Sequence, residues 1–194
     1  MNNKLLIISG YTSSGKNTVV EKLIKKYKFK NIVSTTTRPI RKNEIDGVDY
    51  FFTSKENFQS MLSNDEFVET RSYNTIINVN GKNEKDTWYY GIHKNEFENS
   101  NTQLTAIVDK QGAIDLINYY GEDNCVWIYL GCDENILKSR CLSRGDYIEE
   151  VNRRIHADKK AFKGIEELVH ATINTEQPID SVIEQIMEVY NYYN

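Results

Sequence analysis

A glycine-rich segment close to the amino end has residue types and spacing suited to binding a phosphate group. It reads Gly10-Tyr11-Thr12-Ser13-Ser14-Gly15-Lys16-Asn17-Thr18. Glycines let a loop fold closely enough for its backbone N–H groups to converge on an anion. The helix predicted directly afterwards would add its positive N-terminus, and Lys16 supplies a charge that can reach terminal phosphates. The segment therefore predicts a strand, a phosphate-binding loop and a helix in succession.

The loop departs from the usual phosphate-binding pattern at one position. That pattern places Ser or Thr directly after the lysine as a magnesium ligand, whereas here Asn17 stands there and Thr18 follows. A Gly/Ser-rich loop before a helix is also common as a plain turn, which is the alternative interpretation. The apolar run Leu5-Leu6-Ile7-Ile8 just before it is typical of a buried strand, and this favours the phosphate site.

A first pair of arginines could hold a second phosphate. Arg38 and Arg41 are close in sequence to the hydroxyl of Ser34 and the phenol of Tyr50. Guanidinium groups bind phosphate through two parallel hydrogen bonds, and the hydroxyl groups could add further contacts. Arginines in a solvated loop are the alternative, since most arginines are exposed.

A second set of arginines, Arg140, Arg144 and Arg154, could converge on one anion. The first two are four residues apart on one predicted helix face, and the third follows a short turn later. A charged outer helix face is the alternative. Beside a nucleotide-binding loop such arginines acquire a purpose, because phosphoryl transfer is catalysed mainly by positioning and by neutralising charge.

Asp109 is a carboxylate at the carboxyl end of a predicted inner strand. Ligands bind at this edge in open α/β sheets. The side chain could hold magnesium through water or orient a phosphate acceptor. The alternative is a cap for the helix that starts near Gln111.

The order of predicted elements indicates an α/β fold. Segments rich in β-branched, aromatic and other apolar residues predict strands at 5–8, 31–39, 50–52, 67–69, 104–109, 125–130 and 171–173. Helical spacing of apolar residues predicts helices between them and a last helix from about Asp180. The polar segment from Thr70 to Thr87 is predicted as a hairpin or an extended loop around Asn80-Gly81. Strands and helices in this alternation predict a parallel sheet covered on both faces.

Several helix starts carry local capping signals. Thr53-Ser54-Lys55-Glu56 has the spacing of a capping box ahead of a helix that ends near Ser63. Asp133 can cap one later helix, and Asp146 with Glu149 can cap the next. These signals fix where the predicted helices begin.

Composition excludes several function classes. The chain has 194 residues, which suits one domain, or one core with small mobile lobes. Its net charge of −4 argues against a general nucleic-acid binder. Its apolar runs are too short for a membrane span or a signal peptide, so a cytoplasmic location is expected. Its three cysteines lack a CxxC spacing and are expected to be reduced thiols.

The motifs taken together resemble the guanylate kinase family. The resemblance rests on the phosphate loop and on six further segments in that family's order, covering nearly the whole chain: Ser34-Thr-Thr-Thr-Arg38-Pro-Ile-Arg41, Asp46-Gly-Val-Asp-Tyr50-Phe-Phe, Phe67-Val-Glu69, Tyr89-Tyr-Gly91, Asp109-Lys-Gln-Gly112 and Arg140-Cys-Leu-Ser-Arg144-Gly145. The threonine-arginine-proline and Asp-Gly-Val-Asp-Tyr segments are specific, whereas the loop alone is not.

The resemblance implies a P-loop NTPase fold in three parts: a core (1–33, 93–132 and 158–194), a small mixed α/β lobe for GMP (34–92) and a helical lid (133–157). It implies transfer of the γ-phosphoryl group of ATP to GMP with Mg²⁺, in a monomer or homodimer. The residues implied for ATP are Gly10, Ser13, Ser14, Gly15, Lys16, Asn17, Thr18 and Asn174. Those implied for GMP are Ser34, Arg38, Arg41, Tyr50, Glu69, Tyr90 and Asp109. Those implied for catalysis are Lys16, Arg140, Arg144 and Arg154, and those for the metal are Thr18 and, through water, Asp109.

The base-reading part of this assignment has a physical reason and one departure. A carboxylate at Glu69 can accept from both N1–H and the exocyclic amine of guanine, whereas adenine has no N1–H. Family members usually carry Ser or Thr after Tyr-Gly to touch the guanine, but this chain has Ile92. Ile107 also replaces a frequent acidic residue two positions before Asp109. Two alternatives therefore stay open: a related phosphokinase with another acceptor, such as ribose 1,5-bisphosphate, and a non-catalytic binding module.

Overall fold

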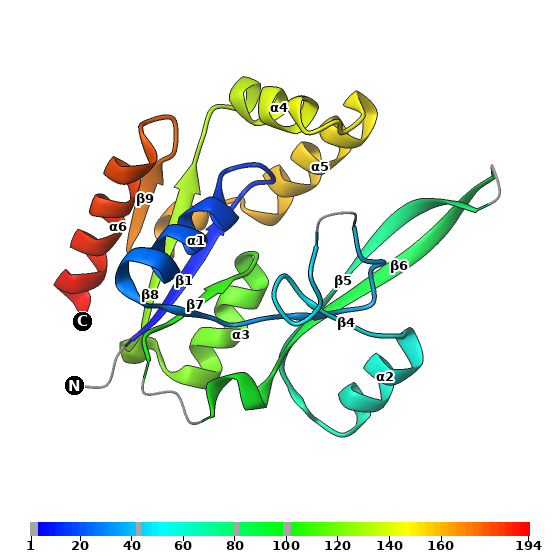
Figure 1. Ribbon diagram of the computed structural model, residues 1–194, viewed down its shortest axis with the longest axis horizontal. Helices are drawn as coiled ribbons and strands as arrows, with labels where there is room; N and C mark the ends of the chain where they lie inside the picture. The colour runs from blue at the N-terminus through cyan, green and yellow to red at the C-terminus, as the bar shows by residue number, and fades with distance from the viewer. Residues whose placement is uncertain (1–3, 42–43, 80–81, 99–101) are drawn as a thin grey trace. The chain divides into compact units, whose positions relative to one another are not determined.

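The apolar run near the amino end forms the middle strand of a five-stranded sheet in the computed structural model, which describes residues 4–41, 44–79, 82–98 and 102–194 (Figure 1). The strands lie in the order β2-β7-β1-β8-β9 and every neighbouring pair is parallel. Their bounds are β1 Leu5–Gly10, β2 Lys30–Asn31, β7 Leu104–Ile107, β8 Cys125–Gly131 and β9 Ala171–Asn174. The sheet belongs to one of two structural units, Met1–Asn31 with Ser100–Asn194.

Helices cover both faces of this sheet, as the alternation of strands and helices predicts. On one face, α1 (Lys16–Tyr27) and α6 (Ile179–Tyr193) contribute Leu23 and Ile186 to a core that includes Leu6 and Ile8 of β1. Successive residues of a strand point to opposite faces, so Leu5 and Ile7 serve the other face. There α3 (Lys110–Tyr120) contacts β1 and β8.

Two further helices follow β8. Helix α4 (Glu134–Ser143) and α5 (Ile148–Ala161) pack through a small buried cluster: Leu137, Cys141, Val151 and Ile155. Asp133 caps α4 as predicted, accepting from Asn135 N. The prediction that Asp146 caps the next helix is wrong, because the cap residue of α5 is Tyr147. Asp146 forms ion pairs with Arg144 and Arg154 instead. The short 3₁₀ helices η2 (Glu122–Asn124) and η3 (Ile165–Glu167) complete the unit.

The second unit, Ile32–Asn99, is a small mixed α/β fold. Its sheet has the order β4-β3-β6-β5, with β3 and β4 parallel and the other pairs antiparallel. The bounds are β3 Thr35–Thr36, β4 Phe51–Phe52, α2 Lys55–Ser63, β5 Phe67–Val79, β6 Lys82–His93 and η1 Lys94–Phe97. The polar segment from Thr70 to Thr87 is thus a long hairpin, and its predicted turn at Asn80-Gly81 lies outside the described residues.

Two local predictions need correction. The segment 31–39, expected as one strand, instead contributes to two strands, β2 and β3, which belong to different sheets. The sequence could not show this, because β-propensity does not say which strand will be the hydrogen-bonding partner. Helix α2 is capped by Ser54, which accepts from Asn57 N, one residue after the expected cap.

The predicted α/β fold with a parallel central sheet is confirmed. Within the described ranges, no helix has the length and apolarity needed to cross a bilayer.

Candidate active site

The phosphate loop joins the carboxyl end of β1 to the start of α1. Gly15 is the N-cap of α1 with a φ of 95°, a left-handed conformation that glycine adopts without strain. Gly10 is required for space: a Cβ there would lie 2.8 Å from the backbone oxygen of Leu130. The hydroxyl of Ser14 is buried, and no residue of the described ranges hydrogen-bonds to it. A buried hydroxyl in this state suits a ligand that completes the loop.

Lys16 folds back over the loop. Its Nζ donates to the carbonyl oxygens of Gly10 and Tyr11, at 2.7 and 2.8 Å. Burial lowers the pKa of Lys16 to about 8, with the nearby Arg144 acting in the same direction and Asp158 in the opposite one. The amine is therefore held at the loop by two neutral acceptors, which an incoming phosphate can replace with a stronger charged one.

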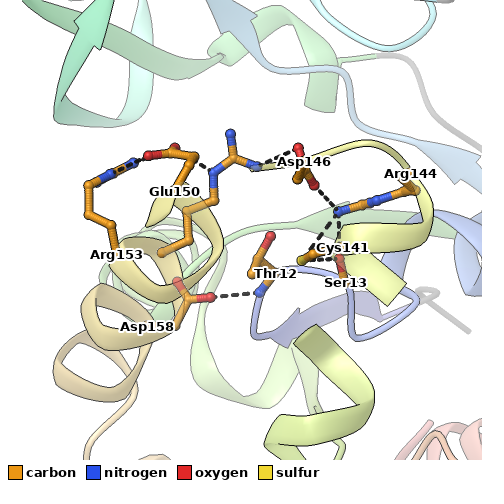
Figure 2. Close-up of polar contacts among 9 residues, drawn as sticks. Thr12, Ser13, Cys141, Arg144, Asp146, Glu150, Arg153 and Asp158 are labelled. Carbon is orange, nitrogen blue, oxygen red and sulfur yellow. Dashed lines mark hydrogen bonds and ion pairs between the residues drawn. The ribbon is translucent and has the colours of Figure 1, made fainter. Parts of the chain in front are cut away.

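Asp158 of α5 is a residue that sequence reasoning missed. Its Oδ2 accepts a hydrogen bond of 2.6 Å from the backbone N of Thr12, in the phosphate loop (Figure 2). Burial raises the pKa of Asp158, while the Thr12 hydrogen bond and the charge of Lys16 act to lower it. The two partners are 146 positions apart, and no spacing motif in the chain links them.

Arg140 and Arg144 reach the phosphate loop from α4. Arg140 donates to the carbonyl oxygen of Thr175 at 2.8 Å, and at 3.4 Å to that of Ser13. Arg144 donates to the hydroxyl of Ser13, which also contacts the Cys141 thiol at 2.9 Å (Figure 2). Two of the three predicted arginines are thus at the loop.

The third arginine, Arg154, is linked to this group through carboxylates. Arg154 pairs with Glu150 at 2.7 Å and with Asp146 at 3.6 Å, and Asp146 in turn pairs with Arg144 at 3.2 Å. Arg153 pairs with the same Glu150, at 2.6 Å (Figure 2). The arginines are therefore held in a network of ion pairs within their own segment.

The other residues predicted in this unit follow strands of the same sheet or lie at the start of α1. Asp109 caps α3, accepting from Gly112 N at 2.9 Å, so the alternative of a helix cap is realised. It follows β7, whose carboxyl end lies beside that of β1. Asn174 ends β9 and accepts from Glu176 N, while Asn17 and Thr18 are exposed in the first turn of α1. No group of three or more His, Cys, Asp or Glu residues arranged to hold a metal occurs in the described part of the chain.

In the second unit, two of the predicted phosphate ligands, Arg38 and Tyr50, lie in contact. This arginine is buried and makes two hydrogen bonds to Glu44, of 2.8 and 2.9 Å. Burial favours the neutral form of Glu44, but the hydrogen bonds from Arg38 and from Arg41 N outweigh this and lower its pKa. The ring of Tyr50 lies 5.1 Å from the guanidinium of Arg38. Glu44, which sequence reasoning missed, thus orients the arginine.

Of the residues predicted to contact GMP, Glu69 and Tyr90 lie on the β5–β6 hairpin, whereas Ser34 directly precedes β3. Glu69 is buried and pairs with Arg71 at 3.2 Å. Tyr90 lies edge-on to Tyr50, with ring centroids 5.9 Å apart. Ser34 is also buried in this unit, whereas the Arg41 residue is exposed. Arg71 was missed by the sequence reasoning, although its spacing two residues after Glu69 on a strand places both on one face.

Comparisons with known proteins identify the family of this chain. The family model described as guanylate kinase matches residues 2–193. The chain belongs to the guanylate kinase family. The guanylate kinase of Mycoplasmoides gallisepticum is 30% identical over 203 residues, covering 100% of this chain and 96% of that protein. The guanylate kinase of Clostridium tetani is 29% identical over 189 residues, covering 95% and 84%.

A solved structure supports the same fold. The crystal structure of guanylate kinase from Anaplasma phagocytophilum matches with a TM-score of 0.63 and 24% identity, covering 98% of this chain and 84% of that one. The predicted resemblance to guanylate kinases is confirmed, and the chain is an enzyme of this type. The roles of individual residues and the boundaries of core, lobe and lid stay predictions.

Proposed function

We propose that this guanylate kinase family member transfers the γ-phosphoryl group of ATP to GMP, giving ADP and GDP. The observation that carries the proposal is the phosphate loop, at which Lys16, Arg140 and Arg144 meet. Phosphoryl transfer needs little covalent help from a protein and depends on positioning and on neutralising charge. Three cations at one loop supply that neutralisation.

The loop unit binds the donor. Backbone N–H groups at the start of α1, with the helix dipole, bind the ATP phosphates. Lys16 exchanges its two carbonyl acceptors for phosphate oxygens, and Arg144 leaves Ser13 for the same reason. Asn174, at the end of β9, lies on the sheet edge proposed for the adenine.

The hairpin unit binds the acceptor. Arg38, oriented by Glu44 and the Tyr50 ring, holds the GMP phosphate together with Arg41. Glu69 accepts from N1–H and the exocyclic amine of guanine. The nucleophile is then an oxygen of the GMP phosphate, which is already anionic, so no general base is required. This oxygen forms the new bond to the γ-phosphorus, while the bond from that phosphorus to the bridging oxygen of ADP breaks.

Magnesium fits the residues present. Mg²⁺ prefers oxygen ligands, keeps several waters and is usually bound through one or two protein oxygens plus substrate phosphates. The Thr18 hydroxyl and the Asp109 carboxylate provide oxygen donors of this kind, and the described residues hold no dedicated metal cage. When bound with ATP, the ion would neutralise charge on the β- and γ-phosphates.

A second acceptor class is the main rival. A kinase for a sugar phosphate such as ribose 1,5-bisphosphate needs the phosphate ligands but no carboxylate to read a base. Glu69 favours a nucleotide, because its carboxylate can accept from both N1–H and the exocyclic amine of guanine, which a sugar phosphate lacks. A non-catalytic binding module would have no use for the cations at the loop. The proposal includes a cytoplasmic location and a monomeric or dimeric enzyme.

The test is a coupled assay of ADP release with ATP and Mg²⁺, using GMP, dGMP, AMP, UMP, CMP and ribose 1,5-bisphosphate in parallel. GMP turnover well above that of the other ribonucleotides and of the sugar phosphate is expected. Glu69→Ala should weaken GMP binding far more than ATP binding, and Asp65→Ala, an exposed carboxylate of the same unit, is the control. Turnover with the sugar phosphate alone, or with nothing, would overturn the proposal.

A further inference from the structure

Four residues share one face of the β5–β6 hairpin. The register pairs Glu69 with Ile92 and Arg71 with Tyr90 across the two strands. Residues directly opposite each other in an antiparallel pair lie on the same face, as do residues two apart on one strand. A carboxylate, an apolar side chain, a guanidinium and a phenol therefore form one contiguous patch.

Arg71 is fixed within this patch from two sides. Its Nη1 donates to Oε1 of Glu69 at 3.2 Å, and its guanidinium lies 6.0 Å from the ring centroid of Tyr90. The side chains of Arg71 and Glu69 are 13% and 0% exposed. Tyr90 is itself packed edge-on against Tyr50 and Tyr73. A guanidinium held between a carboxylate and a ring is pre-organised, so little entropy is lost when it binds a ligand.

Guanine presents two kinds of group to such a patch. Its N1–H and exocyclic amine are donors, whereas O6 and N7 are acceptors. Glu69 can accept but not donate, and the side chain of Ile92 directly opposite has no hydrogen-bonding group. Arg71 is the donor adjacent to Glu69 on this face. A guanidinium matches the O6 and N7 acceptors of guanine through two hydrogen bonds.

We propose that Arg71 is a specificity-determining residue that donates to the O6/N7 edge of guanine while Glu69 accepts from N1–H and the amine. The proposal rests on GMP being the acceptor. It accounts for an apolar Ile92 in a guanine site, because the donor is supplied by the neighbouring strand. It also rejects adenine, whose 6-amino group would direct an N–H toward the N–H groups of Arg71.

The competing explanation is that Arg71 merely holds Glu69 in place. The two are separated by calorimetric binding of GMP, 7-deaza-GMP (which lacks the N7 acceptor) and 6-thio-GMP (in which O6 becomes a poorer acceptor) to the wild-type protein and to Arg71→Met. Binding is measured without ATP. Lys94→Met is the matched control, since Lys94 pairs with the exposed Asp65 in the same unit. Arg71→Lys keeps the charge but not the planar fork.

The wild-type protein is expected to bind at least one analogue more weakly than GMP, by about 5-fold or more, because each analogue weakens one of the two contacts of the bidentate pair. In Arg71→Met this difference should disappear, because GMP itself binds more weakly. Arg71→Lys should recover part of the loss, and Lys94→Met should behave as wild type. Equal penalties in wild type and Arg71→Met, or none in the wild type, would overturn the proposal. A wild-type protein that binds no GMP would instead refute the proposed function.

Discussion

The charge of Lys16 should control how the activity depends on pH. With a pKa of about 8 in the free protein, Lys16 loses its proton on the alkaline side of neutrality. A lysine of that pKa is about 90% protonated at pH 7 and about 10% at pH 9. If the charged amine binds the phosphates, as proposed, kcat/KM for ATP should fall roughly tenfold over this interval, since that parameter reports ionisations of the enzyme before ATP binds.

Asp158→Asn tests the origin of this pKa. The asparagine side chain can still accept from Thr12 N, but the negative charge that raises the pKa of Lys16 is gone. A nearby opposite charge of this kind is worth on the order of one pH unit. The alkaline limb of the profile should therefore move to lower pH by about that amount.

The assay measures kcat/KM for ATP at saturating GMP, from about pH 6 to about pH 10. The ionic strength is held constant, because salt screens surface charges. Phosphate monoester groups have a second pKa near 6, so their ionisation affects the acid side of the profile, and GMP is kept saturating at every pH. Asp115→Asn, in α3, is the control. An unchanged limb in Asp158→Asn, or one moved to higher pH, would refute the assignment of Asp158 as the counter-charge of Lys16.

Three further predictions concern single residues. Lys16→Ala should lower kcat by roughly a hundredfold or more, because one contact to the transition state is lost. Its circular dichroism spectrum should match that of the wild type, and unchanged turnover would refute the mechanism. Gly10→Ala should reduce thermal stability and ATP binding, because its Cβ would meet the Leu130 oxygen at 2.8 Å; wild-type melting would contradict the clash. Glu44→Gln should weaken GMP binding by losing the Arg38 pair. Since the folded pKa of Glu44 is lowered, its contribution to stability is present above its unfolded pKa and is lost as pH falls, so the variant should lose that acid-side slope in urea unfolding.

Much of the fold could be predicted because the relevant signals are local. The apolar runs at β1 and β8 and the capping residue Asp133 each lie within or next to the element that they define. The predictions failed where contacts with residues distant in sequence determine the structure. The β2 and β3 strands look like one segment, but their partners lie in different sheets.

The candidate site shows the same division. Lys16 and the arginines of α4 stand in recognisable patterns, so their approach to the loop could be anticipated. Asp158 and Glu44 could not be found in this way. Asp158 acts through a contact 146 positions away, and Glu44 acts by orienting Arg38. Orienting residues carry no motif of their own, because many backbone geometries can bring a carboxylate to the same cation.

Ion pairs in the segment after β8 also reduce the attraction of the protein for polyanions. They join Arg144, Arg153 and Arg154 to Asp146 and Glu150. An uncompensated group of guanidinium ions would project a positive field and attract any polyanion, including RNA. Internal carboxylates cancel most of that field at long range. Only a ligand that reaches the loop and displaces the carboxylates gains the full attraction. These ion pairs should therefore favour a ligand that reaches the loop over abundant polyanions, at the expense of some affinity for the proposed nucleotide.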